Sequence, residues 1–432
     1  MRIAPADTVF VVLSFEGPDQ YSQAGGLGVR VKELSRALAG QGFETHLFFV
    51  GDPDLPGDEE QAGGLLKLHR WAQWISKMHP LGVYDGEEGK IRDWNHSLPS
   101  HVIDQVIAPA ARAGKRVVIL GEEWHTAWSM SLISDALFYR GLRDKVVMLW
   151  NANNLYGFDR IDLAALQRVT TVTTVSRYMK HRLWQYGVNP IVIPNGIPAT
   201  AIKSPPPKLL AAIREAAGAE LLCFKIGRFD PDKRWLSAIA ALGLLRRQGM
   251  TVRLLMRGGK EPHGADVLAH AAMHGLRVRD IPSPRDVDSL VATLTENRDA
   301  DVLNLISFLP ENMLGPIYSA ADAVLANSGH EPFGLVGLEV MAAGGLAVTG
   351  STGEDYAAGF RNAIVLETDD PLELVTALRG VVEDPAQAKA MRQEGTLAAA
   401  DYTWEKVLAQ LFRRIELAAI RQGSASVAGD PL

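Results

Sequence analysis

Short runs of apolar residues recur along the chain, and helical periodicity lies between most of them. Twelve runs predict buried strands: residues 9–15, 45–50, 117–121, 146–150, 169–175, 191–194, 221–229, 252–256, 302–309, 323–326, 346–349 and 363–366. Continuous apolar strands that alternate with amphipathic helices are typical of parallel sheets covered on both faces. The pattern therefore predicts an α/β fold.

A proline-rich stretch divides this pattern into two sets. Residues 203–208 read KSPPPK, which is typical of a stiff surface linker. The chain has 432 residues, enough for two ordinary cores. We therefore predict doubly wound domains at 1–202 and 209–400, with ligands beyond the carboxyl ends of their strands. The small, polar residues 421–432 are predicted to be disordered.

Composition narrows the class of protein. The chain is 47% hydrophobic and 22% charged, as expected for a globular protein. No run approaches 18 apolar residues, the N-terminus lacks a long apolar segment, and the one cysteine cannot form an internal disulfide. A net charge of −6 and the lack of a known motif disfavour nucleic-acid binding. We expect a cytoplasmic protein without stable membrane insertion.

The stretch from Gly329 to Gly344 is the most informative part of the sequence. It follows the predicted strand at 323–326 and becomes helical around Gly334. Free N–H groups and the positive dipole end of a helix start favour a diphosphate or sugar hydroxyls. Glu331 lies in the predicted loop and Glu339 in the helix, so one carboxylate could hold a sugar and the other a ribose.

The sequence EPFG at 331–334, followed by Glu339, resembles the paired-glutamate signature of the retaining nucleotide-sugar glycosyltransferases of family 4, relatives of glycogen and starch synthases. The resemblance implies a GT-B fold, in which two Rossmann-like domains face each other across a cleft. It also implies that residues 401–420 form a helix that crosses back to the first domain. Glu331 would orient the donor sugar, and Phe333, Gly334 and Leu335 would bind the diphosphate.

A second element of the predicted donor site carries two cations. A strand that ends in glycine puts Arg228 at its carboxyl end, and a turn through Pro231 brings Lys233 back beside it. Two fixed cations suit a diphosphate leaving group. The run resembles the Gly-Arg-Leu-x-x-x-Lys-Gly element of the family, with Phe229 and Arg234 at the two positions that differ. Since no Asp-x-Asp motif accompanies this site, we expect no metal cofactor.

Other donor contacts are predicted as well. By the resemblance, the segment with Phe308 would hold the nucleotide base, mostly through backbone groups. Residues 350–354 follow a predicted strand and could offer N–H groups to the phosphates, with Thr352 as the residue that we expect to contact them. Asn195 follows a predicted strand and matches a position that lines the cleft in the family.

The first half carries a glycine-rich loop and a histidine. Gly26 and Gly28 open a helix, where they could cradle an anion or only form a tight turn. The resemblance to glycogen and starch synthases implies that they approach the donor phosphates. The sequence EEWHTA at 122–127 resembles an Asp-Trp-His segment of glycogen synthases, with Glu123 in place of the aspartate. His125 would reach the reacting sugar.

Two regions keep alternative interpretations. Residues 61–103 are predicted to be irregular, and their aromatic side chains could stack on an acceptor or form a small core under a long loop. The cations Arg30, Lys32 and Arg36 could form a membrane-facing patch, but Glu33 interrupts them and favours a solvated helix face.

We therefore predict a retaining transferase that moves a hexose, best glucose, from a nucleoside diphosphate sugar to a hydroxyl of a sugar or glycan. The family's mechanism implies same-face attack without a metal. A sugar phosphorylase on the same fold and a catalytically silent sugar-nucleotide-binding protein are the alternatives. The base, the sugar and the acceptor stay open.

Overall fold

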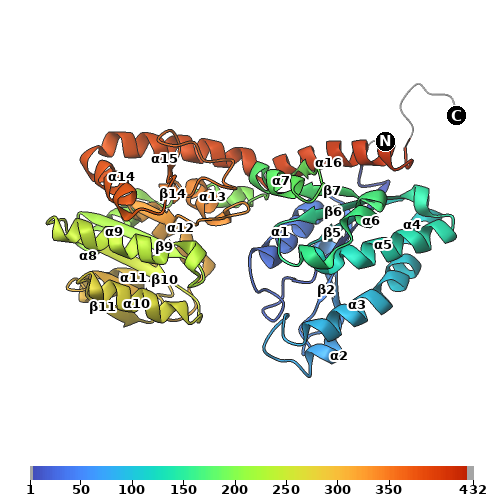
Figure 1. The fold of residues 1–432 in the computed structure, drawn as a ribbon, viewed down its shortest axis with the longest axis horizontal. Helices are drawn as coiled ribbons and strands as arrows, with labels where there is room; N and C mark the ends of the chain where they lie inside the picture. The colour runs from blue at the N-terminus through green and yellow to red at the C-terminus, as the bar shows by residue number, and fades with distance from the viewer. Residues whose placement is uncertain (1–2, 426–432) are drawn as a thin grey trace. The chain divides into compact units, whose positions relative to one another are not determined.

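The computed structural model describes residues 3–425, which form two compact units. The first unit runs to Gly196 and resumes at Trp404, and the second comprises Ile197–Thr403. Each is built on one sheet whose neighbouring strands are parallel, apart from one edge pair in the first unit (Figure 1). The prediction of two α/β parallel-sheet domains is confirmed.

The first sheet has the order β3-β4-β2-β1-β5-β6-β7-β8. Its strands are β1 (Thr8–Leu13), β2 (Glu44–Val50), β3 (Asp58–Gln61), β4 (Leu66–Trp71), β5 (Arg116–Glu122), β6 (Val146–Ala152), β7 (Thr171–Thr174) and β8 (Ile191–Val192). Its helices are α1 (Gly26–Gly40), α2 (Gln73–Ser76), α3 (Glu87–Val102), α4 (Ala108–Arg112), α5 (Trp124–Tyr139), α6 (Leu163–Val169), α7 (Arg177–Trp184) and α16 (Trp404–Arg421).

Both faces of the central strand β1 are buried. In β1, Phe10 and Val12 pack into a core with residues of α1 and α16, while Val9 and Val11 are equally buried on the opposite face. Successive side chains of a strand point to opposite faces, so this central strand needs helices on both sides. The register pairs Val11 with His46 of β2 and Ile119 of β5. Continuous apolar strands are the consequence.

The second sheet has the order β11-β12-β10-β9-β13-β14-β15. Its strands are β9 (Leu221–Ile226), β10 (Val252–Arg257), β11 (Val278–Ile281), β12 (Val302–Leu305), β13 (Ala323–Ala326), β14 (Ala347–Thr349) and β15 (Ile364–Val365). Its helices are α8 (Pro207–Ala217), α9 (Trp235–Arg247), α10 (His263–Met273), α11 (Val287–Glu296), α12 (Glu311–Ala320), α13 (Leu335–Ala342), α14 (Pro371–Glu383) and α15 (Pro385–Ala399). Helices α9, α10 and α14 pack together, as do α8, α11 and α12.

The end of the predicted linker is helical. Pro207 and Lys208 begin α8, because proline lacks the N–H that a first helical residue leaves unpaired in any case. The chain leaves the first unit at Gly196, before the predicted boundary at 202.

Residues 61–103 are more regular than predicted. They contain β4 and the long helix α3, and Trp94 on α3 is fully buried. The prediction of an irregular segment is wrong here, because β4 lies next to the edge strand β3 and mixes apolar with polar side chains, half of which are only partly buried.

The predicted disorder of residues 421–432 is wrong for residues 421–425. Arg421 ends α16, and the Gln422 side chain donates to the Met148 carbonyl oxygen at 2.8 Å. Ser424 donates to the Val146 carbonyl oxygen at 3.1 Å. Residues 426–432 lie outside the described residues.

Candidate active site

Two loops of the second unit are tied together by Asp232. One follows β9 and the other follows β13. The Gly329 N–H donates to the Asp232 carbonyl oxygen at 2.7 Å. The His330 N–H and its ring nitrogen lie at 3.1 and 2.9 Å from an Asp232 carboxylate oxygen. A Cβ at Gly329 would lie 2.9 Å from Asp232 Oδ1, so a larger residue there would push the carboxylate aside.

Lys233 and Glu331 meet across these loops. The Lys233 ammonium lies 2.5 Å from Glu331 Oε2, and the two side chains are 27% and 22% exposed. The Glu331 backbone is fixed from the turn after β14: its N–H donates to Thr352 Oγ1 at 2.9 Å, and its carbonyl accepts from the Gly353 N–H at 2.9 Å. A partly exposed ion pair on a fixed backbone can exchange partners when an anion or a hydroxyl arrives.

Helix α13 begins beside Glu331. Gly334 has a φ of 74°, a conformation that favours glycine, and as the N-cap residue it has no side chain to cap the helix. A Cβ at Gly334 would lie 2.7 Å from Glu354 Cγ and 3.3 Å from Glu331 Cγ, so both carboxylate side chains pass close by. Phe333 is buried against the Tyr356 ring, and Leu335 is half-buried. The uncapped N–H groups and the helix dipole favour an anion at this point.

Two glutamates near α13 are protonated more readily than usual. Burial raises the pKa of Glu339 to about 7, and burial likewise raises the pKa of Glu354 to about 7. Glu339 Oε2 accepts from the Tyr318 hydroxyl at 3.4 Å. Near neutral pH each carboxyl group can therefore be present in both protonation states.

The other predicted residues of the second unit are spread more widely. The Arg228 and Phe308 side chains are exposed, Phe308 at 74%. Thr352 is partly buried and holds the Glu331 loop through its hydroxyl. Below the Lys233 loop, Lys225 donates to Asn327 Oδ1 at 2.6 Å, and burial lowers the pKa of its ammonium well below the usual range.

In the first unit, the start of α1 already has an anionic partner. Glu16 Oε2 accepts from the N–H groups of Ala24, Gly25 and Gly28 at 3.2, 3.0 and 3.0 Å. Its other oxygen accepts from the Tyr84 hydroxyl at 2.6 Å. Gly28 is buried, whereas Gly26 is exposed. The predicted anion cradle exists, and a carboxylate of the protein lies in it.

His125 is the second residue of α5 and is buried, with 4% of its surface exposed. Its Nε2 lies 2.8 Å from Glu87 Oε1, and its ring stacks on Phe15 at a centroid distance of 4.2 Å. Burial lowers the pKa of the imidazole, and its Nδ1 has no hydrogen-bond partner among residues 3–425. A buried histidine with one unsatisfied nitrogen can still bind a ligand atom.

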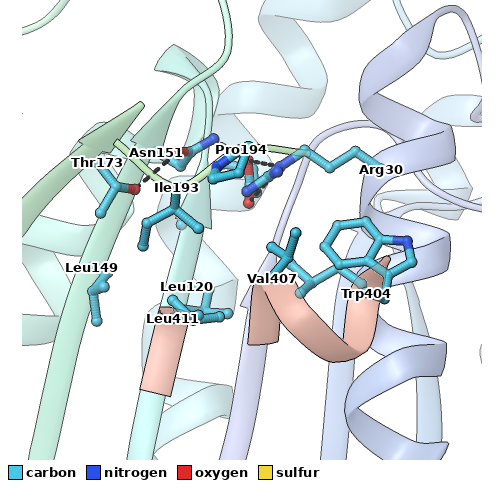
Figure 2. A pocket seen from close by; sticks show the side chains of 13 residues that line it. Arg30, Leu120, Leu149, Asn151, Thr173, Ile193, Pro194, Trp404, Val407 and Leu411 are labelled. Atoms are coloured by element: carbon cyan, nitrogen blue, oxygen red, sulfur yellow. Dashed lines mark hydrogen bonds and ion pairs between the residues drawn. The ribbon is translucent and has the colours of Figure 1, made fainter. Parts of the chain in front are cut away.

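Arg30 lies in a buried polar network instead of on a solvated face. Its guanidinium contacts Glu122 at 3.1 Å and also donates to Asn195 Oδ1. Asn151 Nδ2 donates to the same Glu122 carboxylate at 3.0 Å. Figure 2 shows Arg30 and Asn151 on the polar side of a small cavity of about 20 Å³. Its apolar side is formed by residues that include Leu120, Leu149 and Leu411.

Glu123 is held in a strained conformation next to this network. Its φ is 66°, and its Oε1 accepts from the N–H groups of Asn153 and Asn154 at 2.7 and 3.1 Å. Burial raises the pKa of Glu123 to about 8. The residue fixes the turn between β6 and α6 and the backbone before His125.

Several of these residues carry no signal in the sequence. Asp232 lies inside the predicted donor element, but the pattern gives it no role, and nothing links Glu16 and Tyr84 to the glycine-rich loop. Glu16 binds N–H groups that follow it by eight to twelve residues, which is a tertiary contact without a local pattern. A signal was present only for Glu122, an acid at the carboxyl end of a predicted strand.

The structural neighbours define the class of fold. Sucrose-phosphate synthase from Thermosynechococcus elongatus superposes with a TM-score of 0.68 at 20% identity, covering 95% of this chain and all of that chain. The catalytic domain of starch synthase IV from Arabidopsis thaliana, bound to ADP and acarbose, gives 0.65 at 16% identity over 96% and 99% of the two chains. The protein has the GT-B fold.

Sequence comparisons give the family. Residues 24–200 match Glycosyltransferase Family 4, and residues 211–397 match Glycosyl transferases group 1. A D-inositol 3-phosphate glycosyltransferase of Geodermatophilus obscurus is 25% identical over 93% of this chain and 87% of that protein. A glycogen synthase of Mycobacterium tuberculosis is 32% identical over 50% and 45% of the two chains. The chain belongs to the group 1 glycosyltransferases of GT-B fold, which transfer a sugar from a nucleotide sugar.

Two further features are absent from residues 3–425. None of the helices there is long and apolar enough to span a bilayer. No group of three or more His, Cys, Asp or Glu side chains in this range is placed to hold a metal ion.

Proposed function

We propose that this protein is a retaining hexosyltransferase that moves glucose from a nucleoside diphosphate glucose to a hydroxyl of a sugar or glycan. One observation carries the proposal: the Lys233–Glu331 pair lies next to the uncapped start of α13. A cation, free N–H groups and a carboxylate within one loop cluster match the two ends of a sugar diphosphate.

The leaving diphosphate would be stabilised by the second unit. As the bond between the anomeric carbon and the phosphate oxygen breaks, negative charge grows on that oxygen. Lys233, Arg228 and the N–H groups from Phe333 to Leu335 would face this charge, which is the kind of electrostatic stabilisation that accelerates such reactions most. Glu331 would then accept hydrogen bonds from the sugar hydroxyls, and Glu339 from the ribose.

The proposed mechanism is attack on the same face as the departing group. The acceptor oxygen bonds to the anomeric carbon as the bond to the phosphate oxygen breaks, and that phosphate oxygen takes the acceptor's proton. Because attack and departure use the same face, the anomeric configuration is retained. Double displacement needs a carboxylate nucleophile and a second acid. The Glu331 carboxylate is instead paired with Lys233 at 2.5 Å, which suits positioning of the sugar better than attack.

His125 would contact the sugar near the reacting carbon, and Gly26, Gly28, Asn195, Phe308 and Thr352 stay predicted donor contacts.

Metal independence is part of the proposal, because fixed cations and N–H groups would do what a divalent ion does in other transferases. Activity that survives excess chelator would agree with it, whereas a strict need for Mg²⁺ or Mn²⁺ would contradict it.

The test is a turnover assay with UDP-, ADP- and GDP-glucose and a mixture of sugar acceptors. Release of nucleoside diphosphate together with an α-linked product, identified by NMR, would support the proposal. Formation of sugar 1-phosphate from inorganic phosphate would favour a phosphorylase. An inverted product would contradict retention.

Two acceptor classes follow from the relatives' names. The D-inositol 3-phosphate glycosyltransferases suggest a phosphorylated polyol, and the glycogen synthase suggests a neutral glucan. The first unit helps to choose between them.

A further inference from the structure

A cavity of about 610 Å³ opens beside the glycine-rich loop of the first unit. Gln23 and Ala24 line it from that loop, Asp52 and Asp54 from the segment after β2, and residues 80–85 from the segment before α3. This volume is in the range of sites that hold small molecules. All of the lining residues belong to the first unit, whereas Lys233 and Glu331 belong to the second.

The cavity is connected to His125. Tyr84 lines it and donates to Glu16 at 2.6 Å, and Glu16 in turn accepts the N–H groups at the start of α1. The centroid of the Tyr84 ring lies 5.8 Å from that of the His125 ring. A molecule in the cavity would therefore lie one aromatic ring away from the histidine proposed to reach the reacting sugar.

The charged side chains that line the cavity are all acidic: Asp52, Asp54 and Asp85. Two cations in this part of the first unit are already bonded to protein groups, and Lys90 is bonded to three residues of the lining itself. Arg70 contacts Asp19 at 2.8 Å and Glu59 at 2.7 Å. Lys90 donates to the Tyr21 hydroxyl at 2.6 Å and to the Gly82 and Val83 carbonyls. Among the described residues that line the cavity there is no lysine or arginine.

This lining suits hydroxyl groups and opposes anions. Carboxylates and side-chain amides, such as those of Gln20 and Gln23, accept hydrogen bonds from hydroxyls, and the 43% exposed Tyr84 ring offers a face to sugar C–H groups. Three aspartates line the cavity, and the Lys90 ammonium behind the lining is fully buried, so a phosphate would find no accessible lysine or arginine among the described lining residues. Like charges in close contact repel even in water, and more strongly near a protein surface.

We propose that this cavity binds the acceptor and that the acceptor is a polyhydroxylated molecule without phosphate or carboxylate groups. The inference rests on the proposed function and narrows it to the neutral acceptor class. Asp54 is a specificity-determining residue in this account, because its exposed side chain lines the cavity.

The experiment compares matched acceptors with the intact chain. Glucose is paired with glucose 6-phosphate and myo-inositol with its 3-phosphate, and maltose and trehalose extend the neutral set. Binding is followed by saturation-transfer NMR and transfer by nucleotide release. Slow hydrolysis of the donor without an acceptor is measured in parallel, because it reports the proposed transferase chemistry independently of acceptor choice.

Two charge-reversal variants sharpen the comparison. Asp54→Lys places a cation in the cavity. It is expected to raise the ratio of kcat/KM for the phosphorylated acceptor to kcat/KM for the neutral acceptor about tenfold. Asp7→Lys is the matched control, since Asp7 is exposed and precedes β1 at the amino end of that strand. It is expected to leave the ratio unchanged.

Neutral members that bind and react at least tenfold better than their phosphorylated partners would support the proposal. It is overturned if a phosphorylated member is preferred, if no neutral member binds, or if Asp54→Lys changes the ratio no more than Asp7→Lys does. If the donor is hydrolysed in any of these cases, the proposed transferase function still stands and only the acceptor proposal fails. If none of UDP-, ADP- and GDP-glucose is hydrolysed, the result counts against the transferase function itself.

Discussion

Two helices of this protein begin at glycines after a parallel strand, and their first turns are treated differently. At the start of α1, the N–H groups of Ala24, Gly25 and Gly28 donate to the Glu16 carboxylate. At the start of α13, the N-cap residue is Gly334, which has no side chain to accept from these N–H groups, and the Lys233–Glu331 ion pair lies beside it. The same local motif holds a carboxylate of the protein in one unit and lies beside an ion pair in the other.

The difference teaches that a glycine-rich helix start does not identify a phosphate site by itself. Glu16 is buried, with 4% of its surface exposed, so its charge is compensated by these N–H groups and by Tyr84. A diphosphate would have to displace this carboxylate or bind beside it. At α13, the Lys233–Glu331 pair adds a cation instead. We therefore expect the diphosphate at α13.

The largest expected effect is on turnover. Lys233→Ala removes the cation beside α13 and is expected to lower kcat by about 10²- to 10³-fold, the typical loss when one group that stabilises a leaving anion is removed. Steady-state nucleotide release measures the effect. Lys145→Ala is the control, because Lys145 forms an exposed ion pair with Asp144 and should leave kcat unchanged. Equal activity of both variants would remove Lys233 from the site.

Alanine substitutions at the two ends of α1 test how tightly the glycine-rich loop is packed. A Cβ at Gly28 would lie 3.0 Å from the Gly17 carbonyl oxygen, so Gly28→Ala is expected to cost about 1 to 3 kcal/mol of unfolding free energy. At Gly40, the other end of α1, an added Cβ would have no atom within 4 Å. Gly40→Ala is expected to be neutral or to stabilise by up to about 1 kcal/mol. Denaturant unfolding compares them, and equal effects would show that the loop tolerates a side chain.

A milder change tests the internal anion itself. Glu16→Gln keeps the shape but loses the charge, and charge-assisted hydrogen bonds are about twice as strong as neutral ones. We expect a loss of about 1 kcal/mol in unfolding free energy, measured against Glu60→Gln, which changes an exposed acid. A stability equal to that of the control would mean that the Glu16 charge does not hold the loop.

The smallest effect is a pH dependence in the second unit. The pKa of Glu339 is raised by burial to about 7, so the group gains its negative charge as the pH rises from about 6 to about 8. A charged carboxylate accepts stronger hydrogen bonds from ribose, and nucleotide affinity should rise about two- to fivefold over this range. Calorimetric titration with UDP, ADP or GDP measures this affinity at each pH. In Glu339→Gln, only the pH dependence that comes from the nucleotide's own phosphate groups should remain.

Stability should change in the opposite direction. Because the folded-state pKa of Glu339 lies above its unfolded value, the folded state binds more protons between about pH 4.5 and 7. The stabilisation by this group is present below pH 4.5 and is lost as the pH rises through 7. A wild-type profile that Glu339→Gln does not flatten would contradict the raised pKa.

Much of the fold could be predicted because buried parallel strands are continuous apolar runs. The same rule fails for β3, β4 and β11, because these strands are not continuous apolar runs. β3 reads DEEQ, and β4 alternates apolar and polar residues. A strand at or next to the sheet edge needs fewer apolar side chains, so its pattern resembles a polar loop.

The candidate site was predicted less completely. The sequence placed Glu331 and Lys233 at the ends of two strands, and the structure brings them together through Asp232. The exposed face predicted for Arg30 is wrong, because Glu122 at the end of β5 provides a buried partner. Helical spacing shows which residues share a face, but not which charge from a distant strand will meet them.

The central claim is tested most directly by calorimetric titration of UDP, ADP and GDP into the wild type, Lys233→Ala and Glu16→Gln. Our account predicts that Lys233→Ala weakens the best nucleotide at least tenfold while Glu16→Gln binds it as the wild type does. The reverse result, unchanged binding by Lys233→Ala and a large change in Glu16→Gln, would place the diphosphate at α1 and contradict the account.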